Sequence, residues 1–100
     1  ALMTDLMLGD LLALKGKSSA DLSAWLSDHD PSTASQLASE AGRRGESEAQ
    51  FLRIAVSDFM AEADEEAWAS LISAARDASD PGAACAARMI AFRLQLESIL

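Results

Sequence analysis

Apolar residues recur along the chain at the three- and four-residue spacing of amphipathic α-helices. The most apolar stretch covers residues 47–63, and we expect a helix that is apolar over so much of its surface to be central. β-branched apolar residues, from which sheets are built, are few, with Val56 as the only valine. The pattern therefore predicts an all-α fold of about six short helices in a compact orthogonal or αα-hairpin bundle.

Capping residues and prolines mark the expected helix starts. Ser18 and Ser47 each stand three residues before a residue that completes a capping box, and Asp64 precedes two glutamates that suit the positive end of a helix dipole. Asp-Pro pairs at residues 30–31 and 80–81 each end one helix and open the next, because proline is tolerated at the first helical position.

Glycines mark two expected helix ends. The first helix is predicted over Thr4–Leu14 with Gly16 beyond its end, and the third over Pro31–Ala41, where Gly42 stops it. A chain of 100 residues, half of them apolar, is long enough for one domain with a core. We therefore expect a single domain over residues 1–100, with two αα-hairpin units (18–42 and 64–100) around a central helix (47–63).

The charge of the chain excludes several classes of partner. The formal net charge is −8, and an acidic surface repels both the phosphates of nucleic acids and anionic membrane surfaces. No run approaches the ~20 apolar residues of a membrane span, and no basic segment precedes the apolar N-terminus as in a signal peptide. We expect a cytoplasmic protein that binds neither nucleic acid nor membrane.

Two stretches of the chain look alike. Residues 20–27 (ADLSAWLS) align with residues 63–70 (ADEEAWAS), and each is followed by a helix that opens with Asp-Pro. The second unit has seven more residues between Trp and Pro, which is about two helical turns. We interpret the pair as an αα-hairpin used twice.

The stretches DHDPSTASQLASEAG (residues 28–42) and DASDPGAACAARM (residues 77–89) resemble the turn and second helix of HEAT-type repeats. In that family an Asp-Pro opens a helix whose small residues allow close packing. The usual basic residue after the proline is missing from the first unit, which has Thr33 and Ser35. The resemblance implies a HEAT-like, protein-binding scaffold without catalytic residues. Residues 51–94 are also similar to small helical proteins of proteobacteria, a similarity that implies no particular activity.

His29, the only histidine, stands between Asp28 and Asp30. It is either an oriented general base or metal ligand, or a solvated residue of a turn in which Asp30 caps the next helix. A zinc site needs three or four ligands, and one histidine and one cysteine leave the rest to carboxylates. We favour the turn.

Cys85, the only cysteine, lies about one turn into the last helix. It is either a reactive thiol that His29 approaches in space or a small apolar filler in an alanine-rich seam, and we favour the filler. The same helix face carries Met89, Phe92 and Leu96. We expect Cys85, Met89 and Phe92 to be largely buried against the helix over residues 47–63.

The densest charge lies in residues 58–66, the acidic cluster. Asp58 and Glu62 share a helix face that suits a divalent ion, but the alternating ligands of an EF-hand loop are missing. We favour the interpretation of these residues as a solvated surface that caps a helix. If they have a function, it is that of an acidic patch that binds a basic partner. The members of the cluster are Asp58, Glu62, Asp64, Glu65 and Glu66.

No phosphate-binding glycine loop, Walker-type lysine or G-x-S-x-G elbow occurs in the chain, so we expect no cofactor and no enzyme. Six short helices cannot all turn their stripes into one small core, and the first helix has the least obvious place. Its leucines and methionines form the kind of apolar patch that marks interaction sites, and Trp25 is a natural anchor if exposed. The expected interaction residues are Met3, Leu6, Met7, Leu8, Leu11, Leu12 and Trp25.

The sequence therefore predicts an acidic helical protein–protein interaction module. Its simplest partner is a second copy in a homodimer, and a heterologous protein is the other possibility. The alternative is an enzyme or a metal-binding protein that uses His29, Cys85 or the acidic cluster.

Overall fold

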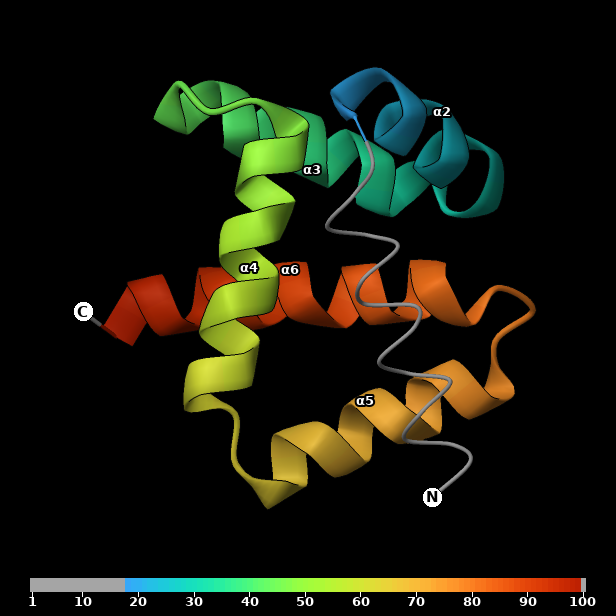
Figure 1. Ribbon diagram of the computed structural model, residues 1–100, viewed down its shortest axis with the longest axis vertical. Coiled ribbons are helices and arrows are strands. Elements are labelled where there is room, and N and C mark those ends of the chain that lie inside the picture. Colours follow the sequence, from blue (N-terminus) through green and yellow to red (C-terminus); the bar gives the residue numbers. More distant parts are fainter. Residues whose placement is uncertain (1–17, 100) are drawn as a thin grey trace.

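The computed structural model describes residues 18–99, which form α-helices and, over that range, no β-strand (Figure 1). The helices are α2 (Ser19–His29), α3 (Pro31–Arg44), α4 (Glu48–Glu62), α5 (Glu65–Asp77) and α6 (Pro81–Ile99). The all-α prediction is confirmed. The helix predicted over residues 4–14 lies outside the described residues, as do the expected interaction residues Met3, Leu6, Met7, Leu8, Leu11 and Leu12.

The predicted caps are confirmed at the helix starts. At each of them a side-chain oxygen accepts a hydrogen bond from the backbone amide three residues later. Such a bond satisfies one of the amides that the first turn of a helix leaves without a partner. The capping residues are Ser18, Asp30, Ser47, Asp64 and Asp80.

The prediction that Gly42 ends the third helix is wrong. α3 continues through Gly42 to Arg44, and Gly45 ends it with a left-handed φ of 69°. The amide of Gly45 donates to the carbonyl groups of Ala41 and Gly42. Because glycine adopts positive φ without steric cost, Gly45 is the residue that turns the chain toward α4.

α4 and α6 cross near the middle of the molecule (Figure 1). α6 packs against α4 and α5, while α4 also packs against α3 and α2, and α2 packs against α3. Figure 1 shows α2 and α3 beyond one side of α6 and α5 beyond the other. None of the described helices is long and apolar enough to cross a membrane.

The core joins all five described helices. Among residues 18–98, Met60 is the one large apolar side chain that is exposed, at 50%. The five described helices bury most of their apolar stripes in one core, because α4 and α6 each offer a face to more than one neighbour. The premise that six helices cannot all do so includes the helix over residues 4–14, and it stays a prediction. The largest fully buried side chains are Leu22, Leu26, Leu37, Phe51, Leu52, Val56, Phe59, Leu71, Cys85, Met89 and Ile90.

Candidate functional site

His29 is the last residue of α2, and its imidazole faces the start of α6. Its Nε2 atom lies 3.4 Å from Oδ2 of Asp80, and 46% of its side chain is exposed. The indole Nε1–H of Trp25 donates a 2.9 Å hydrogen bond to the same Oδ2 atom. His29 is exposed, as its interpretation as a turn residue predicts, but that interpretation missed the contact with Asp80.

Asp80 joins the two segments that carry the Asp-Pro pairs. Its Oδ1 atom accepts the Ala83 amide at 3.1 Å, while Oδ2 accepts the Trp25 indole. Burial by itself would raise the pKa of the Asp80 carboxyl, but these hydrogen bonds and the nearby His29 outweigh it and lower the pKa. A Cβ atom on Gly82 would lie 3.1 Å from the Trp25 ring, so glycine leaves room for the indole. These contacts hold α2 against the start of α6.

Cys85 is fully buried in the core, together with Met89, as predicted. Phe92 is only partly buried, which the prediction for this face did not anticipate. The contact that His29 makes with a charged side chain is with the carboxylate of Asp80.

The acidic cluster is divided between two helices. Asp58 and Glu62 belong to α4, whereas Asp64 caps α5 and is followed by Glu65 and Glu66 in its first turn. Within residues 18–99, no group of three or more histidine, cysteine or acidic side chains is placed to hold a metal ion.

A second group of charges, the Phe51 cluster, was missed by the sequence reasoning. It consists of Phe51, Glu46, Arg93, Arg44 and Glu97. The guanidinium group of Arg93 lies 4.2 Å from the centre of the Phe51 ring, and that of Arg44 lies 5.2 Å from it. Arg93 donates to both carboxylate oxygens of Glu46, at 2.9 and 3.0 Å, and to the carbonyl oxygen of Phe51 at 3.2 Å.

The carboxylates of the Phe51 cluster are held in their charged form. The hydrogen bond from Arg93 lowers the pKa of Glu46, and the hydrogen bond from Arg44 lowers the pKa of Glu97. Arg44 also pairs with Glu40 one helical turn earlier. The only available sequence signals were the four-residue spacings within α3 and α6. The other pairs, which join α6 to the α3–α4 turn and to the end of α3, lie 47 and 53 residues apart in the sequence.

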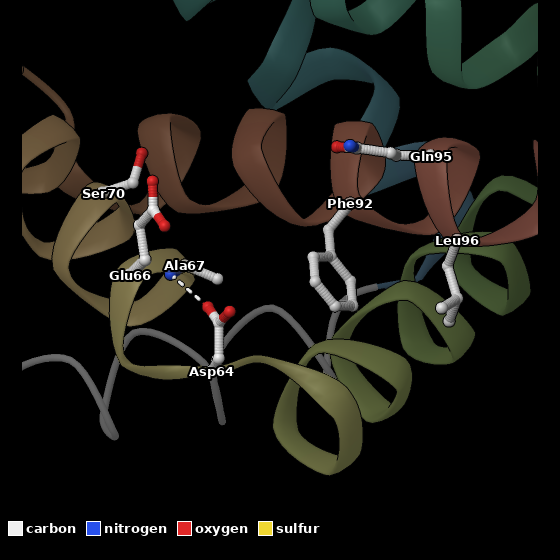
Figure 2. A pocket seen from close by; sticks show the side chains of 7 residues that line it. All are labelled: Asp64, Glu66, Ala67, Ser70, Phe92, Gln95 and Leu96. Atoms are coloured by element: carbon white, nitrogen blue, oxygen red, sulfur yellow. Dashed lines mark hydrogen bonds between the residues drawn. The ribbon is translucent and has the colours of Figure 1, made fainter. Parts of the chain in front are cut away.

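A groove of about 400 Å³ runs between the start of α5 and the second half of α6 (Figure 2). Figure 2 shows Phe92 and Leu96 projecting from α6, with Phe92 between Leu96 and Ala67 of α5. A hollow of about 170 Å³ continues along α6 and is lined in part by Arg88 and Ala91. We call the two together the α5–α6 groove. Its remaining lining residues are Phe59, Asp64, Glu66, Ser70 and Gln95.

Aromatic packing fixes the floor of the groove. The Phe59 ring lies edge-on to Trp68, with ring centres 4.9 Å apart, and edge-on to Phe92, with ring centres 5.1 Å apart. Phe59 is 2% exposed, whereas Phe92 is partly exposed. Edge-on aromatic pairs have a preferred geometry, so this row presents Phe92 to the groove in a defined position.

Charged side chains also line the groove. Asp64 and Glu66 of α5 line its larger part, and Arg88 of α6 lines its continuation. Figure 2 shows Glu66 beside Ser70, with Phe92 between this pair and Leu96. Among the described residues, neither Glu66 nor Arg88 takes part in an ion pair. An apolar floor with charged side chains along its rim suits the apolar face of an amphipathic helix.

Comparison with known proteins found no protein family, no curated protein and no solved structure that matches the chain. The contacts around Asp80 and in the Phe51 cluster join charges within the chain. The α5–α6 groove is different, because Phe92 on its floor is partly exposed and the charged side chains of Glu66 and Arg88 that line it are exposed. It is the candidate functional site.

Proposed function

We propose that this protein is a small acidic protein–protein interaction module that binds a helix in the α5–α6 groove. The observation that carries the proposal is Phe92, a partly exposed aromatic ring on a floor fixed by Phe59. Aromatic residues in pockets are frequent anchors of protein interfaces. The role is non-enzymatic, requires no cofactor and belongs in the cytoplasm.

The simplest partner is a second copy of the chain. The segment that holds Leu8, Leu11 and Leu12 has the spacing of an apolar helix face, which is what the groove receives. Symmetric dimers are the commonest assemblies of identical chains. The alternative partner is a different protein that presents a helix with a similar apolar face. A HEAT-like arrangement of the two Asp-Pro hairpins is part of the same proposal, because such scaffolds bind proteins.

Sedimentation equilibrium of the full chain over a concentration series tests the proposal. We expect a monomer–dimer equilibrium that is weakened at least about tenfold by the double variant Leu8→Asp, Leu11→Asp, because aspartates on the docking face lose the apolar contact. Ser70→Arg should weaken it as well, since Ser70 is exposed at the rim of the groove and a long side chain there obstructs it.

Met60→Arg is the matched control for Ser70→Arg, because Met60 is exposed on α4 and does not line the groove. Circular dichroism should show that all variants keep the helical content of the wild type. A wild type that stays monomeric over the whole series contradicts self-association. A dimer that Ser70→Arg and Met60→Arg weaken equally contradicts the groove as its site.

A further inference from the structure

We infer that the α5–α6 groove binds a basic amphipathic helix of a different protein. The apolar face of that helix lies on Phe92 and Leu96, and its lysine or arginine side chains lie beside Asp64 and Glu66. The inference rests on the proposed function, because it concerns the same groove, and it adds the charge and the source of the helix. Two observations carry it, which are the polarity across the groove and the net charge of the chain.

The two walls of the groove differ in polarity. The α6 wall presents Phe92 and Leu96, which lie one helical turn apart, together with the uncharged Gln95. The α5 wall presents the carboxylates of Asp64 and Glu66. Figure 2 shows these two carboxylates on one side of Phe92 and Leu96 on its other side. A helix in the groove therefore meets an apolar surface along one flank and negative charge along the other.

The negative charge of the α5 wall is not neutralised within the described part of the chain. Asp64 and Glu66 are exposed and join no ion pair there. Their sequence neighbours Glu62 and Glu65 are also exposed and also without an ion pair in this range. In residues 18–99 no lysine or arginine lines the larger part of the groove, and Arg88 lines only its smaller continuation. A cation on the docking helix therefore faces carboxylates that have no other ionic partner among these residues.

The net charge of the chain favours a different protein over a second copy. A second copy is the simplest source of an apolar helix, but it carries the same formal net charge of −8. Two molecules of like net charge repel each other as they approach, whereas a basic partner is drawn toward an acidic surface. The acidic wall therefore suits a partner whose docking helix is basic.

A helical pattern describes the occupant. Leucines at positions i, i+4 and i+7 form one apolar stripe that covers Phe92 and Leu96. Lysines at positions i+1, i+5 and i+8 lie about a quarter of a turn round the helix, where they face α5. The lysine peptide is a synthetic peptide of about four helical turns with this pattern and with alanine and glutamine elsewhere. The glutamate peptide has glutamates in place of the lysines and is otherwise identical.

Fluorescence anisotropy of each labelled peptide, titrated with the full-length protein at low salt, tests the inference. We expect the lysine peptide to bind at least about tenfold more tightly than the glutamate peptide. Glu66→Lys should weaken binding of the lysine peptide about fivefold, because attraction becomes repulsion at the α5 wall. Asp28→Lys is the matched control, since it makes the same charge change on the exposed surface of α2, and it should alter binding by less than about twofold.

A second pair of variants tests whether the groove is the binding surface. Ser70→Arg obstructs the groove and should weaken binding of the lysine peptide at least about fivefold. Met60→Arg adds the same charge outside the lining of the groove and should alter binding by less than about twofold. Circular dichroism should show that all four variants keep the helical content of the wild type.

Equal binding of the two peptides would overturn the inference, because the groove would then not distinguish charge. Equal effects within either pair of variants would overturn it as well. If neither peptide binds, but the wild type dimerises and Ser70→Arg weakens the dimer more than Met60→Arg, a second copy is the occupant. The inference is then overturned while the proposed function stands. The proposed function fails with the inference only if neither peptide binds and the wild type stays monomeric over the concentration series.

Discussion

The Phe51 cluster and the α5–α6 groove are built from the same residue types but differ in exposure. Each places a phenylalanine beside arginine and acidic side chains. Phe51 is fully buried, and the arginines over its ring are paired with Glu46 and Glu97. Phe92 is partly exposed, and Glu66 and Arg88 beside it join no ion pair within residues 18–99.

The difference follows from how many helices meet at each place. At Phe51, α6 packs against α4, and the turn between α3 and α4 supplies Glu46. The side chain of Arg93 is therefore only 6% exposed, and its buried charge needs a partner. At the groove, α5 packs mainly against α6, and Phe59 of α4 reaches only its floor. The exposed charges of Glu66 and Arg88 therefore stay hydrated, and their placement costs little free energy. Buried charges therefore stabilise the fold here, while exposed charges are available for recognition.

Of the variants considered, replacement of Arg93 should lower the free energy of unfolding most. A small effect would contradict the contrast between the Phe51 cluster and the α5–α6 groove. Arg93→Ala removes the cover of Phe51 and leaves the Glu46 carboxylate without its partner, so we expect a loss of about 3 kcal/mol in the free energy of unfolding. Urea denaturation measures it. Arg88→Ala on the same helix is the matched control and should change stability by less than about 0.5 kcal/mol, because Arg88 is exposed. Equal losses of stability for Arg93→Ala and Arg88→Ala would show that the Phe51 cluster and the groove contribute alike to the stability of the fold.

Acid should weaken the Phe51 cluster. The pKa values of Glu46 and Glu97 are lowered in the folded protein from an ordinary value of 4.5, so around and below this pH the unfolded chain binds more protons. Stability that is fully present above pH 4.5 is therefore lost as the pH falls through the lower, folded-state pKa values. Thermal unfolding from pH 7 down to about pH 3 measures this loss. The Glu46→Gln variant should be less stable than the wild type at pH 7 and should lose less stability on acidification. A pH dependence equal to that of the wild type would contradict the role of the Arg93–Glu46 pair.

The two glycines near the end of α3 should respond in opposite directions. Gly45→Ala forces a side chain into left-handed backbone at the turn that carries Glu46, and we expect a loss of about 1 kcal/mol. Gly42→Ala should gain up to about 1 kcal/mol, because Gly42 is helical and a Cβ there meets nothing within 4 Å. Chemical denaturation of both variants measures the difference. If Gly42→Ala loses stability and Gly45→Ala does not, the helix ends at Gly42 and not at Gly45.

The smallest effect on stability is expected in the groove. Glu66→Gln should change the free energy of unfolding by less than about 0.5 kcal/mol, because Glu66 is exposed and joins no ion pair among the described residues. The same variant should weaken binding of the lysine peptide, measured by fluorescence anisotropy at low salt, and the effect should fade as salt screens the charge. A variant that is destabilised but binds the peptide normally would show that Glu66 belongs to the fold and not to a docking site.

Helix starts were predictable because their causes are local. A capping oxygen and the amide it accepts are three residues apart, so Ser18, Asp30, Ser47, Asp64 and Asp80 are recognisable without any tertiary contact. The end of α3 was less predictable, because Gly42 and Gly45 both suit a helix end. The direction in which the chain leaves toward α4 decided which of them took a positive φ.

The sites depended on contacts that local pattern does not contain. Periodicity placed Phe92 on the same stripe as Cys85 and Met89, but which turns of that stripe are covered depends on where α4 and α5 cross α6. The Trp25–Asp80 bond spans 55 residues and the Arg93–Glu46 pair spans 47. Helix spacing and capping act within about four residues, so they determine that the chain is helical and where most helices begin. The packing of helices distant in sequence decides which charges are buried in pairs and which groove stays open, because only that packing brings their side chains together or leaves them in water.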